Sequence, residues 1–251
     1  RLHRVVHEAI KLFCHNKPSK IKDASISETS TKQSVFSSEA LIRSVTQTLY
    51  TFKDRQDQIV LVPHLKAFTT EIKNMFPESG ALYSVSLKFP KTEISEIYLF
   101  FARTLHRFCS FKIAQEFNVA NLKIWQDSAR THFVASIYDE IGCLNRTLGK
   151  LKIAKEYHQW ALEIRIEQLV PNHVDVATSY NNLGTVLSDI GDLEKAKEYQ
   201  QRAAEIQKEQ LGPNHVDVAA SYSKLGTVYR NTGDLEKAKE YHQWALEIRK
   251  E

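Results

Sequence analysis

The chain has 251 residues, of which 42% are hydrophobic and 25% charged, values typical of one or two globular domains. No segment has the ~18 consecutive apolar residues of a membrane span, and no charged-then-apolar leader opens the chain, so we expect neither a membrane segment nor a signal peptide. The net charge of +4 divides into +7 over residues 1–130 and −3 over residues 131–251, and neither excess forms the clustered stripe that would predict a nucleic-acid partner.

The first 91 residues contain segments of helical spacing separated by polar connections. Apolar residues recur every three or four positions in residues 1–16 and indicate an amphipathic helix. Residues 17–36 are rich in Ser, Thr and Lys with almost no apolar side chains, so they cannot offset the entropy of ordering, and we predict a flexible linker. Within residues 37–91, helical spacing over 37–52 and 63–76 predicts a pair of helices leading into the rest of the chain.

An internal repeat follows. Val174–Glu209 matches Val216–Glu251 at 25 of 36 positions when shifted by 42 residues. Ala154–Arg165 recurs without change at Ala238–Arg249, two periods later, so there are three copies. The copies span residues 132–168, 174–210 and 216–251. Such periodicity is typical of a solenoid, in which each unit buries its apolar face against its neighbours.

Residues 92–128 are predicted to be a degenerate fourth copy. A shift of 40 places Tyr98 on Tyr138 and Ala114 on Ala154, positions that recur in the other copies. The predicted repeat domain therefore covers residues 92–251.

Each copy has the pattern of two helices joined by a short turn. In the second copy, Gly191 stands where a helix can end in a left-handed residue, and Asp192 follows as a good N-cap for the next helix. Gly184 and Ala196 are small, which predicts a close approach of the two helices. Pro213 comes after the second helix and cannot continue it, so it marks the end of the unit.

The repeated pattern consists of an aromatic residue, a Leu-Gly pair, a second aromatic residue and two later alanines. In the last copy these are Tyr222, Leu225, Gly226, Tyr229, Ala238 and Ala245. The pattern resembles the tetratricopeptide repeat, and the 42-residue period with the connection Gly-Pro-Asn-His-Val-Asp-Val-Ala resembles its kinesin-light-chain type. The resemblance implies an all-α fold, a solenoid of antiparallel helix pairs preceded here by an irregular helical region. It also implies a concave face built from the first helix of each pair.

Two segments before the repeats resemble STAND-type (NB-ARC-like) NTPases that carry such repeats. Leu2–Glu8 resembles the His-Arg-Leu-Val-Gln segment near the end of their winged-helix module, and Leu61–Phe68 resembles the stretch between their NTPase part and the repeats. The alternative for residues 1–16 is an ordinary surface helix. The nearest approach to a phosphate loop, Leu148–Leu151, lacks the earlier glycine and the Ser or Thr after its lysine, so any NTPase module is expected upstream of Arg1.

Residues of chemical interest form no recognisable catalytic or metal-binding pattern. The ten histidines lack the i, i+4 pairing or the cysteine partners of a metal site, and His173 and His215 are equivalent residues of two copies. The three cysteines have no Cys-x-x-Cys spacing and suit a reducing compartment, so we expect a cytoplasmic protein. We predict no enzyme activity, no catalytic residue, no cofactor and no metal.

The predicted binding surface is the concave face, where a protein or peptide ligand would lie. Between the second and third copies, differences in the first helix concentrate at polar positions, which suggests a surface that varies with the ligand; neutral drift is the alternative. The amides of Asn181 and Asn182 could bond a peptide backbone, and Arg146 and Arg230 could pair with acidic side chains. The predicted partner-binding residues are Asp139, Arg146, Thr178, Asn181, Thr185, Ser188, Ser223, Thr227 and Arg230.

Three functions are compatible with these features. The first is a non-catalytic protein-interaction scaffold, the second is the ligand-sensing arm of a STAND-type signalling NTPase, and the third is a cargo adaptor like kinesin light chain. The third lacks the heptad coiled coil that would precede the repeats. The chain opens at Arg1, and no polar capping helix follows Glu251, so we expect a fragment truncated at both ends whose open repeat end could allow self-association.

Overall fold

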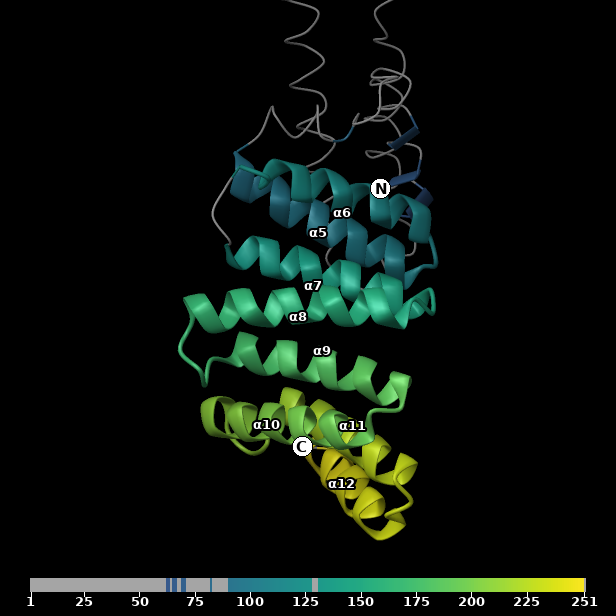
Figure 1. Cartoon of the computed structure of the whole chain (residues 1–251), viewed down its shortest axis with the longest axis vertical. Helices are drawn as coiled ribbons and strands as arrows, with labels where there is room; N and C mark the ends of the chain where they lie inside the picture. Colours follow the sequence, from purple (N-terminus) through teal and green to yellow (C-terminus); the bar gives the residue numbers. More distant parts are fainter. Residues whose placement is uncertain are drawn as a thin grey trace, which may run out of the picture. The chain divides into compact units, whose positions relative to one another are not determined.

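The computed structural model describes residues 62, 63, 65, 66, 69, 70, 82, 90–127 and 131–250 of the chain. Within 90–127 and 131–250 the regular secondary structure is entirely α-helical (Figure 1), which confirms the predicted all-α fold. The helices there are α5 (Lys91–Arg107), α6 (Phe111–Ile124), α7 (His132–Thr147), α8 (Leu151–Gln168), α9 (Val174–Ile190), α10 (Leu193–Leu211), α11 (Val216–Asn231) and α12 (Leu235–Ile248). None of these helices is long and apolar enough to cross a membrane.

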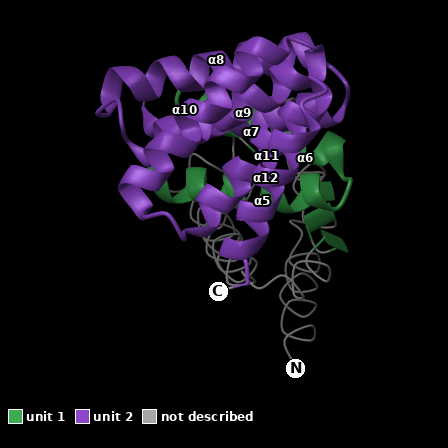
Figure 2. Cartoon of the chain, turned by 90° about the horizontal axis from the view of Figure 1, so that it is seen from below, with its two compact units in different colours: residues 1–127 green, residues 128–251 purple. Residues whose placement is uncertain are grey.

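The predicted helix at residues 1–16 and the predicted linker at 17–36 lie outside the described residues, and so does most of the helix pair predicted within 37–91. The chain divides into two compact units, residues 1–127 and residues 128–251 (Figure 2). Helices α5 and α6 belong to the first unit, and α7 to α12 belong to the second.

Helices α5 and α6 form a hairpin around three aromatic side chains. The rings of Tyr98 and Phe101 on α5 meet the ring of Phe117 on α6 edge to face, with centroids 5.1 Å and 5.5 Å apart. All three side chains are fully buried, and edge-to-face pairs contribute about 0.5–1.5 kcal/mol beyond the burial of their area. Trp125 Nε1 donates to the hydroxyl of Ser95 at 3.0 Å and closes the end of the hairpin. The predicted degenerate repeat falls on this hairpin.

Helices α7 to α12 form three successive pairs, α7/α8, α9/α10 and α11/α12 (Figure 1). A short turn reverses the chain within each pair, so its two helices run antiparallel. The second helix of one pair packs against the first helix of the next, α8 on α9 and α10 on α11. This arrangement is the predicted solenoid, in which neighbouring pairs share a core.

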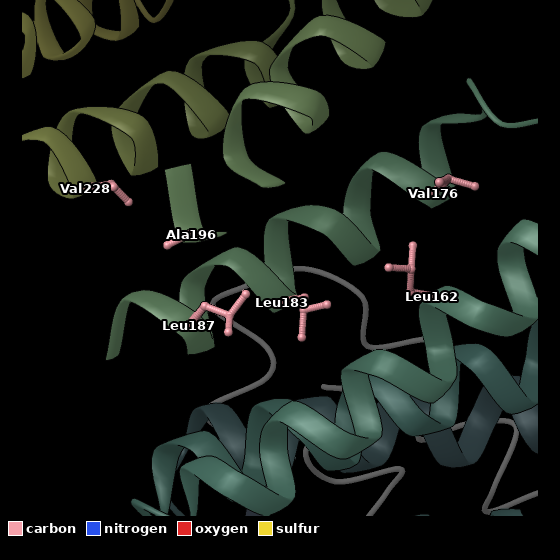
Figure 3. Close-up of a cluster of buried hydrophobic side chains, with 6 residues drawn as sticks. All are labelled: Leu162, Val176, Leu183, Leu187, Ala196 and Val228. Carbon is pink, nitrogen blue, oxygen red and sulfur yellow. The ribbon is translucent and has the colours of Figure 1, made fainter. Parts of the chain in front are cut away.

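One buried cluster illustrates how the pairs share their core. It consists of Leu162 of α8, Val176, Leu183 and Leu187 of α9, Ala196 of α10 and Val228 of α11 (Figure 3). The rings of Tyr180 and Tyr199 pack against the cluster and stack on each other with centroids 5.5 Å apart. Because three pairs contribute to one cluster, no single pair could bury its apolar face alone.

The turns within the pairs follow the predicted chemistry. Gly191 has φ 96°, and the backbone N–H groups of Gly191 and Asp192 donate to the carbonyl of Leu187 at 3.0 Å and 2.9 Å, which ends α9. The carboxylate of Asp192 then accepts from the backbone N–H of Lys195 at 3.4 Å and caps α10. The predicted helix stop and N-cap are both confirmed.

The connections between pairs reveal a function for the repeated histidines. His173 Nδ1 accepts from the backbone N–H of Asp175 at 3.1 Å, and His215 Nδ1 accepts from that of Asp217 at the same distance. Each histidine is therefore the N-cap of a first helix. Their recurrence in two copies reflects this capping contact.

A glycine of each first helix makes room for a polar side chain of the second helix. The two helices approach closely at Gly184, because a Cβ on this residue would lie 2.9 Å from the side-chain amide of Gln200 on α10. A Cβ on Gly142 would likewise lie 2.6 Å from the imidazole of His158. The absent side chain therefore admits a polar group into the space between the two helices.

We expect Gly142→Ala to destabilise the chain, because its Cβ would collide with His158. His158 is 1% exposed and hydrogen-bonded, so its ring cannot move aside, and overpacking of this kind costs about 1–3 kcal/mol. Gly226→Ala is the matched control, since its Cβ would meet His242 at 2.8 Å but His242 is exposed and can turn away. There the better helix propensity of alanine, worth about 1 kcal/mol, should leave stability unchanged or raised. Thermal unfolding followed by circular dichroism measures both variants, and equal losses would contradict this account.

Candidate functional site

The first helices of the three pairs, α7, α9 and α11, are linked side by side and form one surface. Arg146 Nε on α7 donates to Asp189 Oδ2 on α9 at 2.6 Å, and Asn231 Nδ2 on α11 donates to Ser188 Oγ on α9 at 3.4 Å. We call this surface the first-helix wall. Its residues, all exposed or half-buried, are Ser136, Cys143, Arg146, Thr178, Asn182, Thr185, Ser188, Asp189, Ala220, Ser223, Lys224, Thr227, Arg230 and Asn231.

Most residues that the sequence predicts to bind a partner lie on the first-helix wall. They are the exposed Arg146, Thr178 and Arg230 and the half-buried Thr185, Ser188, Ser223 and Thr227. The three threonine hydroxyls donate to the backbone carbonyl four residues earlier, at distances between 2.7 and 3.2 Å. The oxygens of Thr178 and Thr227 can still accept from a ligand, whereas Thr185 Oγ1 already accepts from Gln200 Nε2 at 3.3 Å. That these residues bind a partner stays a prediction.

The other two predicted residues, Asp139 and Asn181, lie in the interior and are 6% and 5% exposed. They occupy equivalent positions of α7 and α9, one period apart. The sequence prediction placed both on the concave face. The structure corrects this placement, because each side chain contacts the second helix of its own pair or the first helix of the next pair. Both residues therefore join the pairs to one another.

Asp139 is the centre of a charged cluster between the first and second pairs. His158 Nδ1 donates to Asp139 Oδ1 at 2.8 Å, and Arg165 Nη1 donates to both Asp139 Oδ2 and Ser179 Oγ. Burial alone would raise the pKa of Asp139, but the hydrogen bond from His158 and the charge of Arg165 hold that pKa below its ordinary value. Asp139 is therefore ionised, and we call these four residues the charged junction.

The junction between the second and third pairs has the same plan without charges. Asn181 Nδ2 donates to Ser221 Oγ at 2.6 Å, Ser221 Oγ donates to Gln207 Oε1, and Gln200 Nε2 donates to the backbone carbonyl of Asn181 at 3.0 Å. These four residues, the amide junction, stand one period after the four of the charged junction. Between the first and second copies, the three ionisable residues of the charged junction are each replaced by Asn or Gln, while the serine is retained. This joint change is the sequence signal that identifies the junctions.

The charged junction brings together the residue types of a hydrolase triad, Asp139, His158 and Ser179. Ser179 Oγ accepts from Arg165 and is 0% exposed. A nucleophile needs its base within hydrogen-bond reach and a path for the substrate, and this serine has no such path. The cluster therefore contributes to the contact between the first and second helix pairs.

Within residues 90–127 and 131–250, no group of His, Cys, Asp and Glu is arranged to hold a metal ion.

Lys224 is a wall residue that the sequence prediction missed. Its amine forms no ion pair with any residue that the structure describes. Burial lowers the pKa of Lys224 to about 8, and the charge of Arg146 reinforces this effect. Burial also raises the pKa of Cys143 to about 12, so this thiol is protonated at neutral pH. The difference between Asn182 and Lys224 in successive copies is the signal that could have indicated this position.

Family models match the part of the chain that contains α7 to α12. Residues 134–175 and residues 171–251 each match a model of the tetratricopeptide repeat. Residues 134–251 are tetratricopeptide repeats. The match confirms the repeat type that the Leu-Gly and alanine pattern predicts. No curated protein sequence is significantly similar to the chain.

Solved structures share the fold of these tetratricopeptide repeats. BtubC (BKLC) from P. vanneervenii aligns with a TM-score of 0.63 at 21% identity, over 99% of this chain and 91% of that chain. A P. anserina protein of the kinesin-light-chain type, with nearly identical TPR-like repeats, aligns with a TM-score of 0.61 at 17% identity, over 84% of this chain and 95% of that chain. At these identities the likeness shows the fold alone. The resemblance to STAND NTPases stays a prediction.

Replacing Asp139 alone should lower the free energy of unfolding more than replacing all three ionisable residues of the charged junction together. Asp139→Asn leaves Arg165 buried without a counter-ion, and breaking a buried ion pair in this way costs about 3–5 kcal/mol. Adding His158→Gln and Arg165→Gln reproduces the amide junction, so the triple variant should recover most of that loss. Urea unfolding of the full chain measures both variants. A triple variant no more stable than Asp139→Asn alone would show that the amide set does not fit here.

The charged junction also predicts sensitivity to acid. The pKa of Asp139 is lower in the folded chain than in the unfolded chain, so its ionisation adds stability above about pH 4 that is lost as the pH falls through the folded value. The triple variant has no ionisable side chain at the junction and should lose less stability between about pH 5 and pH 3. Urea midpoints across this range test the difference. Parallel curves for the two proteins would contradict it.

Proposed function

We propose that the chain is a protein-interaction scaffold whose first-helix wall holds an extended segment of a partner protein that carries carboxylate side chains. Tetratricopeptide repeats are typically scaffolds of this kind, and solenoids offer extended surfaces suited to such segments. The observation that carries the proposal is Lys224, a half-buried amine with no ion pair among the described residues. A carboxylate at ion-pair distance would stabilise the charged form that burial disfavours.

The neighbouring wall residues favour the same class of ligand. Arg230 is exposed and has no ion pair within the described part of the chain, whereas Arg146 is already paired with Asp189. The side-chain amide of Asn182 has no hydrogen-bond partner among the described residues, and such a group can bond a peptide backbone. Packed helices lie about 8–10 Å apart, a distance that an extended chain spans in about three residues. A ligand bonded to Asn182 can therefore place a carboxylate near Lys224.

A cargo adaptor is the second candidate function. The likeness of the fold to repeats of the kinesin-light-chain type supports this candidate. A cargo adaptor would use the same wall for the same class of ligand. The two functions differ in the protein that contributes the bound segment, which for a cargo adaptor is the cargo.

Selection of peptide ligands tests the proposal. The full chain is used to select binders from a random peptide library, and fluorescence anisotropy gives the Kd of a selected peptide. Lys224→Ala should weaken binding about tenfold, the loss of one charge-assisted contact, and Asn182→Ala should weaken it less. Lys152→Ala on α8, an exposed residue outside the wall, is the control and should have no effect. Selected peptides without Asp or Glu, or a Kd indifferent to both wall variants, would refute the proposal.

The lowered pKa of Lys224 makes the same binding depend on pH. The amine is mostly charged at pH 7 and mostly neutral at about pH 9.5, so affinity for a carboxylate peptide should fall across this range. Lys224→Arg keeps its charge throughout and should remove the dependence. Anisotropy titrations of the two proteins at both pH values make the comparison. An equal fall in both would assign the pH effect to another group.

A further inference from the structure

The outer face of the third helix pair repeats the face that the first pair turns toward α9. Ala238–Arg249 of α12 is identical in sequence to Ala154–Arg165 of α8. Three side chains of this stretch are buried in α8, namely His158, Leu162 and Arg165. The same three side chains are exposed in α12, where they are His242, Leu246 and Arg249, and we call them the third-pair face.

The contact between α8 and α9 shows what covers such a face. Leu162 lies in one buried cluster with Val176 and Leu183 of α9 (Figure 3) and is 3% exposed, whereas Leu246 is 53% exposed. Arg165 Nη1 donates to Ser179 Oγ, which is also on α9. Because the same residues stand on the same kind of helix in α12, the third-pair face fits the first helix of a further pair.

A second contact between successive first helices leads to the same kind of partner. Arg146 Nε of α7 donates to Asp189 Oδ2 of α9 at 2.6 Å. One period later, Ser188 Oγ accepts from Asn231 Nδ2 at 3.4 Å, so the same two positions meet at both junctions. Arg230 stands at the position of Arg146, is exposed, and forms no ion pair with any described residue. Its counter-ion would come from a following first helix, at the position of Asp189.

One difference between the first and third pairs determines which charge the partner must carry. Arg165 also donates to Asp139 of its own pair, and this carboxylate neutralises it. The third pair has Ser223 at that position, and Arg249 forms no ion pair within the described part of the chain. A helix that covered Arg249 would bury its charge, which is strongly unfavourable without a counter-ion. The covering helix must therefore supply a carboxylate, at the position where α9 has Ser179.

We propose that the third-pair face and Arg230 together form a docking surface for the first helix of another helix pair, one that carries two carboxylates. The first carboxylate stands at the position of Ser179 and pairs with Arg249. The second stands at the position of Asp189 and pairs with Arg230. This surface contains neither Lys224 nor Asn182, so it is distinct from the contacts proposed for a peptide on the first-helix wall.

The apolar and charged parts of this surface have different roles. Leu246 contacts an aliphatic residue at the position of Val176, which first helices of this repeat share, since α11 has Val218 there. The two arginines select among such helices by charge. Helix α11 of a second copy would be a poor partner, because it has Ser221 and Asn231 at the two acidic positions.

The experiment extends the full chain by one helix pair. A copy of residues 168–211, which contains α9 and α10, is joined after Glu251 so that the repeat period continues. Hydrogen exchange followed by mass spectrometry gives the protection factors of the amides of α12 and of the appended first helix. Ser179→Asp in the appended copy alone should raise the protection of that helix about tenfold over the unchanged copy, the gain from one charge-assisted contact.

Two variants of the chain itself test the charges. Ser223→Asp gives Arg249 a carboxylate from its own pair, as Asp139 does for Arg165. In that chain the appended Ser179→Asp should lose its advantage, because one arginine cannot neutralise two buried carboxylates. Arg230→Ala should lower the protection of both appended copies about threefold, the smaller effect of an exposed ion pair.

A further variant tests the apolar contact. Leu246→Glu should remove the protection of both appended copies, while the unextended chain stays folded because Leu246 is already exposed. Lys239→Glu is the matched control and should have no effect, since its equivalent Lys155 stays exposed on α8 although α9 covers that helix. Lys224→Ala changes only the first-helix wall and should leave all protection factors as they are. Circular dichroism establishes that each variant is folded.

Several results would overturn the proposal. They are equal protection of the two appended copies, an advantage of the appended Ser179→Asp that persists with Ser223→Asp, and protection that persists with Leu246→Glu. Protection of α12 that rises with concentration in the unextended chain would also overturn it, since a second copy of the chain would then cover the third-pair face.

Discussion

A polar side chain buried between two helices governs how each helix pair joins the next. His158 and Gln200 enter their pairs because a glycine of the first helix leaves space for them. Once buried, such a group must be hydrogen-bonded, since an unsatisfied one costs about 1–3 kcal/mol. The partners are Asp139 and Asn181, whose clusters reach the first helix of the following pair through a serine. The hydrogen bonds therefore favour one register between neighbouring pairs.

Two different sets of side chains provide these hydrogen bonds on the same backbone plan, although Asn181 Oδ1 and Gln200 Oε1 of the amide set have no partner among the described residues. The charged junction neutralises a buried carboxylate with Arg165, and the amide junction replaces the charges with mutually bonded amides. At the first junction, removing either Asp139 or Arg165 alone would leave the other buried without its counter-ion. The third copy has a third combination at these positions, Ser223, His242 and Arg249. The apolar cores tolerate more variation, because Leu162 and Ala204 stand at equivalent positions. The junctions specify the stacking, while the cores and surfaces are left to vary.

The surfaces that the junctions leave open are those suited to ligands. On the first-helix wall, Lys224 and Asn182 stand at equivalent positions of neighbouring first helices and are not used in joining the pairs. This surface changes where one copy differs from another, so a repeat with a uniform backbone can present different side chains to a ligand.

The sequence by itself determined the helices, their pairing, the turn at Gly191 and Asp192, and the period of the stack, because these depend on local spacing and local backbone conformation. Part of the candidate surface was also predictable, since Arg146 and Arg230 are polar residues on the outer side of their helices. Only the tertiary structure decided that Asp139 is buried and that Lys224 is a half-buried cation. Burial and pKa depend on which neighbouring pair covers a residue, and the helical periodicity of one segment does not indicate which pair that is.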